Sequence, residues 1–195
     1  MWEHVPMTDI TVRELAADEW EIFKTLRLRA LQEDPEAFVA SYEEESQHSD
    51  EEWQERMSHA TRIGAQQGSE WVALASVGDE DTRDDDDLGE VYGIWVTPSL
   101  RGEGVARRLM EHAELVGRNA GYSHLAYWVN TDNGRAVAFA SSIGYRPTEG
   151  RRDVVVEGQP EVEAAFMIPL GSDTDETPLA LQNDVDEEST GDAPD

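Results

Sequence analysis

Short segments of apolar or alternating residues recur along the chain and predict β-strands. In chain order, these segments are 9–15, 62–67, 71–78, 90–96, 124–129 and 162–170. The second and third are separated only by Gly-Ser-Glu, which predicts an antiparallel hairpin. The C-terminal part of the pattern accommodates one or two final strands.

Between these strands, apolar residues return every three or four positions, which predicts helices. The most periodic helix runs from Gly104 to Gly121, where the second glycine is expected to cap the C-terminus. Its apolar stripe consists of Val105, Leu109, Ala113 and Val116. Further helices are predicted over 19–31, 49–60 and 133–144, and Ser49 or Asp50 is expected to cap the second of these.

The order of these elements indicates one mixed α/β sheet. It begins with antiparallel hairpins and contains a strand, helix, strand crossover in the middle. With 195 residues, of which 38% are hydrophobic, the chain is expected to form a single core. Residues 171–195 are rich in Asp, Glu, Thr and Pro, which predicts a disordered acidic tail.

The net charge of the chain limits the classes of molecule that it is expected to bind. The chain has 43 acidic and 15 basic residues, a net charge of -28, and Lys24 is its single lysine. Such a balance argues against nucleic acid and anionic membranes as partners, because phosphate groups are bound by clustered basic side chains. It also suggests a halophilic protein that works in concentrated salt. The alternative is that acidic loops, such as 79–89, and the tail inflate the count, although the tail holds only nine of the acids.

The absence of cysteine excludes disulfides, thiolate metal sites and a cysteine nucleophile. The histidines lack the spacing of metal ligands, so no metal is expected. No apolar run approaches the roughly 18 residues of a membrane span, and the N-terminus lacks the features of a signal peptide. We therefore expect a cytoplasmic protein without a membrane partner.

The segment WVTPSLRGEGVARRLMEHAELVG, residues 95–117, combines a strand end, a glycine-rich turn and a helix start. A helix start presents unpaired N–H groups and a partial positive charge. Gly102 and Gly104 permit close approach to the backbone, and Arg101 adds a fork of donors, so the turn could bind a phosphate or pyrophosphate. The alternative is a tight turn that uses glycine only for its backbone angles. Two phosphate loops are excluded, since no Gly-Lys-Ser/Thr follows and Arg107 replaces the third glycine of a dinucleotide fingerprint.

Two sequence blocks together make the assignment more specific. The first, an Arg-x-x-Gly-x-Ala turn after a strand, consists of Arg101, Gly104 and Ala106. The second, an Asn-x-x-Ala-x-x-Phe block that ends in Gly-Tyr, consists of Asn133, Ala136, Phe139, Gly144 and Tyr145. In this order they resemble the GCN5-related N-acetyltransferase (GNAT) superfamily, strongly over 90–147 and loosely over 9–170.

The resemblance implies a fold and a cosubstrate. The fold is a single α/β (α+β) domain over residues 1–170, with a central mixed, mostly antiparallel twisted sheet flanked by about four helices. The cosubstrate is acetyl-CoA, whose pyrophosphate would bind the backbone of Arg101, Gly102, Glu103, Gly104, Val105 and Ala106. Pantetheine would meet the main chain of Ile94, Trp95 and Val96, and an amide near Val96 would polarise the thioester carbonyl. Asn133 would hydrogen-bond the cofactor arm, next to Ala136 and Phe139.

The resemblance also raises the question of acid and base. Many family members carry a tyrosine acid where this chain has Ala140, so we expect water, or no dedicated acid, to serve. Glu90 occupies the place of the glutamate base in the histone-acetylating branch. Alternation puts Glu90, Tyr92 and Ile94 on one face of the strand. The alternative for Glu90 is a solvent-exposed acid at the start of a strand.

The expected function is acetyl-CoA-dependent N-acetylation of a small-molecule amine or a peptide N-terminus, by direct attack in a ternary complex. Two alternatives stay open: a non-catalytic acyl-CoA-binding or sensor module, and a protein lysine acetyltransferase, which only Glu90 supports. The acceptor would be chosen by residues 18–60 and a loop near 150–162, where no motif is readable. The oligomeric state is open, with a homodimer among the alternatives.

Overall fold

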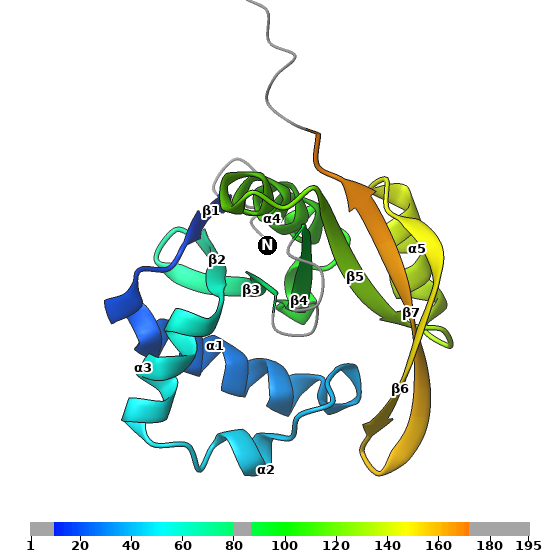
Figure 1. The fold of residues 1–195 in the computed structure, drawn as a ribbon. Coiled ribbons are helices and arrows are strands. Elements are labelled where there is room, and N and C mark those ends of the chain that lie inside the picture. Colours follow the sequence, from blue (N-terminus) through cyan, green and yellow to red (C-terminus); the bar gives the residue numbers. More distant parts are fainter. Residues whose placement is uncertain (1–9, 80–86, 172–195) are drawn as a thin grey trace, which may run out of the picture.

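The computed structural model describes residues 10–79 and 87–171. The predicted tail, most of the acidic loop and the first nine residues lie outside this range. The described residues form seven strands and five α-helices (Figure 1). In chain order these are β1 Ile10–Glu14, α1 Trp20–Glu33, α2 Tyr42–Glu45, α3 Asp50–His59, β2 Thr61–Gln67, β3 Glu70–Gly78, β4 Leu88–Val96, α4 Val105–Ala120, β5 His124–Asn130, α5 Gly134–Ser142, β6 Arg146–Val156 and β7 Gln159–Pro169.

The strands form one sheet in the order β1-β2-β3-β4-β5-β7-β6. Every neighbouring pair is antiparallel except β4 and β5, which are parallel and joined through α4. The sheet is twisted, with β1–β4 on the left of Figure 1 and β5, β7 and β6 on the right. The predicted mixed, mostly antiparallel sheet is therefore confirmed, with five helices in place of about four.

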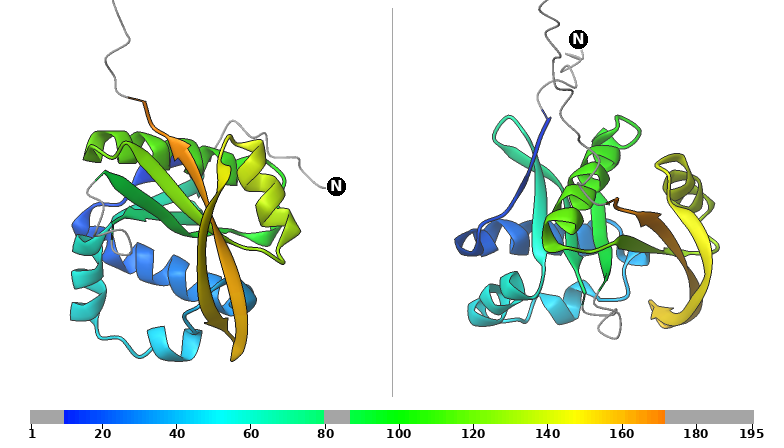
Figure 2. Two further views of the ribbon diagram at one scale, coloured as in Figure 1. Left: turned by 45° about the vertical axis from the view of Figure 1, so that its right-hand side comes forward. Right: turned by 45° about the horizontal axis from the view of Figure 1, so that its top comes forward.

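Helices cover both faces of the sheet, and each face has its own apolar core. On one face α4 and α5 pack, and the predicted stripe of α4 is entirely buried there. On the other face lie α1, α2 and α3 (Figures 1 and 2). Trp53 of α3 is fully buried there and meets Phe23 of α1 edge to face, with ring centroids 5.7 Å apart. As expected, Ser49 caps α3: its side chain accepts from the backbone N–H of Glu52.

The C-terminal hairpin corrects the prediction of a loop near 150–162. β6 and β7 pair antiparallel through a two-residue turn, in which Glu157 has φ +48° and Gly158 has φ +77°. Two positive φ angles are typical of the type I′ turn, whose twist suits a hairpin. The sequence pattern leaves open whether a strand precedes 162–170 and sets no bounds for β6, because its alternate positions are mostly charged or small. The feature of the sequence that could have predicted this hairpin is the Glu-Gly pair between two alternating segments.

β4 contains a bulge at Gly93. On β3 and β4, Leu74 pairs with Trp95 and Ser76 with Tyr92, so β4 has one residue more than β3 between these two pairs. Gly93 has φ +62°, a conformation that is unfavourable for residues with a Cβ atom. The bulge interrupts the ladder and bends the strand.

The extra residue corrects the predicted facing of the end of β4. Glu90, Tyr92 and Ile94 were expected on one face, but Ile94 packs with Val91 in the core against α4. Trp95 instead belongs to the core against α1. One inserted residue reverses the alternation of all side chains that follow it.

We expect Gly93→Ala to lower the free energy of unfolding by about 1–2 kcal/mol, because alanine must adopt the left-handed backbone conformation of the bulge. Gly134→Ala is the matched control: this glycine lies in a helix, has no positive φ and faces open space, so the change should be neutral or mildly stabilising. Urea denaturation measures both. Equal stability of Gly93→Ala and the wild type would contradict the bulge conformation.

Candidate active site

A cavity of about 720 Å³ opens where β4 and β5 separate. Their parallel ladder covers only three residue pairs and ends at Glu90 and Ala126. Beyond this point, Gly93 and Ile94 line one wall of the cavity and Tyr127 lines another. Residues from α1, α3, the segment 36–45 and the β6–β7 hairpin complete it. The cavity thus lies between the two halves of the sheet.

The glycine turn after β4 presents a row of free backbone donors. Gly102 and Gly104 have φ +84° and +82°, and α4 begins directly after them. The first hydrogen bond of the helix runs from the N–H of Arg108 to the carbonyl of Gly104, at 3.2 Å. Within the described residues, no acceptor meets the backbone N–H groups of Gly102, Gly104, Val105, Ala106 and Arg107. This arrangement suits an anion such as pyrophosphate.

The side chain of Arg101 has a different place from the predicted one. Its Nε donates to the carbonyl of Val96 at 3.0 Å, and its Nη2 donates to Asp34 at the end of α1. Trp95 Nε1 donates to the same carboxylate at 2.7 Å. Burial alone would raise the pKa of Asp34, but the hydrogen bonds from Arg101 and Trp95 outweigh it and lower the pKa. Arg101 therefore ties the turn to α1, so the donors that remain available to an anion at the turn are the backbone amides.

The structure brings only part of the predicted cofactor set to the cavity. Of this set, Ile94, Asn133 and Ala136 line it, and so does the candidate base Glu90. The residues of the set that do not line it are Trp95, Val96, Arg101, Gly102, Glu103, Gly104, Val105, Ala106 and Phe139. Most of these form the turn and helix start that follow β4, so they extend the site along the sequence.

The second sequence block forms α5 and the residues that cap it. Asn133 is the N-cap: its Oδ1 accepts from the N–H of Ala136 at 3.0 Å. The side-chain oxygen of Asn133 thus already accepts a hydrogen bond. Its Nδ2 has no acceptor in the part of the chain that the structure describes. Ala140, at the position where the resemblance expects a tyrosine, is completely buried in the core.

Glu90 is buried at the cavity wall. Its residue exposure is 3%, which rules out the alternative of a solvent-exposed strand-start acid. Arg152 of β6 places Nη2 3.5 Å from Oε1 of Glu90, and its Nε donates to Glu163 of β7 at 2.7 Å. The guanidinium also lies over the ring of Trp128, 4.5 Å from the centroid. The β6–β7 hairpin, which sequence reasoning largely missed, therefore helps to hold the candidate base.

One tyrosine lines the cavity, and a second packs against it in the core. Tyr127 lines the cavity, and burial, with a smaller effect from Glu163, raises the pKa of its hydroxyl to about 12. Its ring meets Tyr145 edge to face, with centroids 6.3 Å apart. Tyr145 is fully buried, and burial also raises its pKa. Both hydroxyls are therefore protonated at neutral pH.

Comparison with known proteins identifies the family. A sequence model described as the acetyltransferase (GNAT) family matches residues 24–145, more than half of the chain. The chain belongs to the GNAT acetyltransferase family. The match includes the first block and all of the second, as well as the candidate base and the residues of α2 and α3.

Solved GNAT structures share the fold. An acetyltransferase of the GNAT family from Streptococcus pneumoniae superimposes with a TM-score of 0.68 at 15% identity, covering 83% of this chain and 99% of that one. A GNAT acetyltransferase from Elizabethkingia anophelis, solved with acetyl-CoA bound, gives a TM-score of 0.59 at 16% identity, covering 83% and 98%.

A curated relative matches a shorter part of the chain. Mycothiol acetyltransferase from Jonesia denitrificans is 40% identical over 60 residues, which are 31% of this chain and 19% of that protein. Within residues 10–79 and 87–171, no cluster of His, Cys, Asp or Glu could hold a metal ion. None of the helices in these ranges is long and apolar enough to cross a bilayer.

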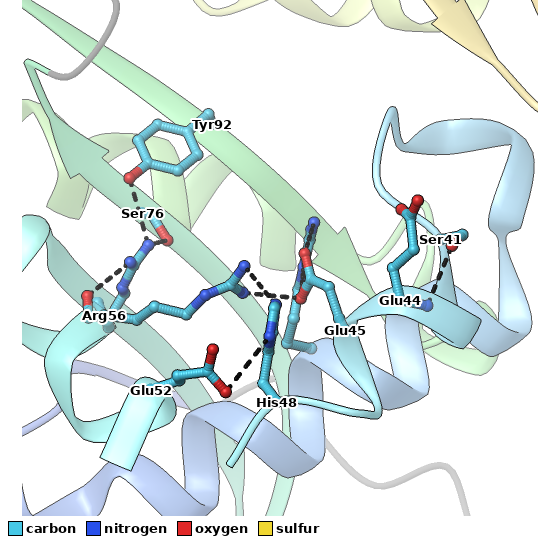
Figure 3. A network of polar contacts seen from close by, with 10 residues as sticks. Ser41, Glu44, Glu45, His48, Glu52, Arg56, Ser76 and Tyr92 are labelled. Atoms are coloured by element: carbon cyan, nitrogen blue, oxygen red, sulfur yellow. Dashed lines mark hydrogen bonds and ion pairs between the residues drawn. The ribbon is translucent and has the colours of Figure 1, made fainter. Parts of the chain in front are cut away.

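The side of this GNAT fold formed by α1, α2 and α3 contains a buried carboxylate that the sequence did not reveal. Glu45, at the end of α2, is 4% exposed. It accepts from Arg27 Nη2 at 2.9 Å and from Arg56 Nη1 at 3.0 Å (Figure 3). Burial alone would raise the pKa of Glu45, but the hydrogen bonds and charges of Arg27 and Arg56 lower it below the ordinary 4.5. Nothing in the run Glu43–Glu44–Glu45 distinguishes this residue, because its burial depends on α1 and α3.

We expect Glu45→Gln to lower the free energy of unfolding by about 3 kcal/mol at pH 7, because it leaves two partly buried arginines without their carboxylate. Since the pKa of Glu45 is depressed in the folded state, its contribution is present above the pKa of the unfolded chain and is lost as the pH falls through the folded value. The stability difference between wild type and variant should therefore shrink below about pH 4.5.

Urea denaturation at several pH values measures this difference. Glu44→Gln, at the exposed neighbouring position, is the control and should change stability by less than about 0.5 kcal/mol. A Glu45→Gln effect that stays constant from pH 7 to pH 3 would contradict the ion-pair assignment.

Proposed function

We propose that this GNAT protein transfers the acetyl group of acetyl-CoA to a primary amine of a small molecule or a peptide N-terminus, by direct attack in a ternary complex. The observation that carries the proposal is the arrangement along β4. A buried carboxylate, Glu90, and the bulge at Gly93 line one cavity, and the strand leads into the row of unpaired amides at the start of α4.

The residues present suit acetyl-CoA as the donor. Pyrophosphate is an anion, and unpaired N–H groups at a helix start bind anions without a cluster of basic side chains. Nδ2 of Asn133 offers a further donor at the cavity wall, and Ile94 lines the same cavity beyond the end of the β4–β5 ladder. A protein with so few basic residues can therefore hold the cosubstrate.

The chemistry needs one proton acceptor and a leaving group. In our proposal Glu90 accepts a proton from the acceptor ammonium, directly or through water, so that the neutral amine can attack the thioester carbonyl. The C–N bond forms, the C–S bond breaks, and CoA departs as a thiolate. The attacking nitrogen then loses its second proton, to water or to the departed thiolate, which leaves the neutral amide. Because a free thiol has a pKa of about 8.5, the thiolate can leave without a dedicated acid. This accords with Ala140 at the position of the usual tyrosine.

Ala140 also favours a second candidate, a non-catalytic acyl-CoA-binding or sensor module. The two candidates are separated by measuring acetyl-CoA binding by calorimetry and CoA release with a thiol reagent across a panel of amines. The transferase proposal expects saturable CoA release with at least one amine. Tight acetyl-CoA binding without release on any amine would reject it in favour of the sensor.

A further inference from the structure

The end of the cavity near α1 and α3 carries an excess of positive charge in an otherwise very acidic protein. Arg27, Arg56 and Arg62 all line this end. Among the described residues, the one buried carboxylate that pairs with them is Glu45, which binds the first two (Figure 3). Three guanidinium groups thus face one buried carboxylate. Glu36 and Glu44 also line the cavity, but both are exposed, so water screens them.

Arg62 has no carboxylate partner among residues 10–79 and 87–171. Only 7% of the residue is exposed. Its Nη1 donates to Ser76 Oγ at 2.8 Å and to Tyr92 Oη at 3.3 Å, and its Nη2 donates to the carbonyl of Arg56 at 2.7 Å. All three acceptors are neutral. Its Nε has no acceptor in the part of the chain that the structure describes.

A buried cation without a counter-ion is unfavourable. Phe23 partly offsets this cost, since the guanidinium of Arg62 lies 4.4 Å from the centroid of its ring. Burial lowers the pKa of Arg62, yet an arginine stays charged at neutral pH. The cavity wall therefore retains an uncompensated positive charge that an anionic ligand could neutralise.

The part of the cavity wall that Glu90 and the β6–β7 hairpin form has the opposite excess. Glu90, Glu161 and Glu163 line it together with one cation, Arg152. Three carboxylates thus accompany one guanidinium there. The cavity is consequently positive towards α1 and α3 and negative towards the β6–β7 hairpin. A ligand with an ammonium group at one end and a carboxylate at the other matches this distribution.

We propose that the acceptor is an amino acid or a similar small zwitterion, whose carboxylate binds at Arg62 and whose amine lies towards Glu90. The inference rests on the proposed function and specifies its substrate class. Glu90 and Tyr92 lie two residues apart on β4, and the hydroxyl of Tyr92 contacts Arg62. The anion site and the candidate base are therefore neighbours along one strand, which would fit a small acceptor.

The test compares matched ligands on the full-length protein. Each L-amino acid is paired with its carboxamide and with the decarboxylated amine, which together separate the loss of the carboxylate from the change in amine basicity. Thermal-shift binding and CoA release are both recorded. We expect the amino acid to exceed the decarboxylated amine by about ten- to a hundredfold in kcat/KM, since hydrogen bonds to charged groups contribute that much.

Arg62→Met should remove this preference, and Arg62→Lys should retain part of it. Arg13→Gln is the matched control: Arg13 also lies over an aromatic ring, that of Trp71, but does not line the cavity, so it should keep the preference. If Arg62→Met does not fold, the ligand series on the wild-type protein still tests whether the acceptor needs a carboxylate.

The outcomes distinguish the two proposals. Carboxylate-dependent binding without turnover would support the anion site and reject the transferase proposal. Turnover that is equal for all three members of a series, or highest for the amine without carboxylate, would overturn the anion site and leave the transferase proposal in place. An absence of both binding and turnover would reject both.

Discussion

Glu90→Gln is expected to lower kcat for acetyl transfer by about 10²- to 10⁴-fold, the usual contribution of a positioned general base. Glutamine keeps the shape of the side chain and loses the proton acceptor. The binding of acetyl-CoA should change little, because the donors for its pyrophosphate lie in the turn after β4. Steady-state kinetics with a saturating amine, together with calorimetric binding of acetyl-CoA, measures both quantities.

Glu163→Gln is the matched control for this variant. Glu163 also contacts Arg152, so its change disturbs the same guanidinium without removing the candidate base. We expect its kcat to fall by less than about tenfold, much less than that of Glu90→Gln. If the two substitutions lowered kcat equally, the loss would be explained by the changed charge around Arg152, and Glu90 would not be the base.

The second large effect is expected for the turn. Arg107→Glu should raise the KM for acetyl-CoA by about 30-fold or more, because a carboxylate in the first turn of α4 repels the pyrophosphate. The same carboxylate should leave the stability of the free protein unchanged or raise it by about 0.5 kcal/mol, since acidic residues are favourable at a helix start. The KM for acetyl-CoA, measured by kinetics, should therefore rise without a loss of stability, measured by thermal denaturation.

Arg118→Glu supplies the control at the other end of the same helix. It makes the same change of charge in the last turn of α4, far along the helix from the turn. Its KM for acetyl-CoA should stay within about twofold of the wild-type value, while its stability falls slightly because the helix dipole disfavours an acid there. If both variants raised the KM equally, overall charge would explain the effect and the turn would not be the pyrophosphate site.

Local patterns predicted the fold well where a single period persists along an element. The stripe of α4 repeats over sixteen residues, and all four of its predicted apolar positions are buried. The hairpin of β2 and β3 follows from two apolar segments separated by Gly-Ser-Glu. β6 was left open, as the first of one or two final strands, because the charged residues of an edge strand conceal the alternation that identifies a half-buried strand.

The sequence predicted only those parts of the site whose structure depends on a few consecutive residues. The glycine turn and the cap Asn133 depend on a few consecutive residues, so their positions could be predicted. The bulge at Gly93 could not, because an inserted residue is defined against β3. The contact of Arg101 with Asp34 joins residues 67 positions apart. The ion pairs of Glu45 likewise depend on which members of an acidic run turn inward.

The charge of the protein agrees with this arrangement. At a net charge of -28, long-range attraction cannot gather anions, so any anion must be bound by local groups. Two such groups are the backbone amides of the turn and the arginines that line the cavity. We propose that the first bind the cosubstrate and the second the carboxylate of the acceptor.

The central claim is that the cavity between β4 and β5 is an acetyltransferase active site for a primary amine. Mass spectrometry after incubation with acetyl-CoA that carries isotope-labelled acetyl tests it most directly. We expect labelled acetyl on the nitrogen of the acceptor, one equivalent for each CoA released, and almost none with Glu90→Gln. Bound acetyl-CoA that stays intact in the presence of every amine would contradict it.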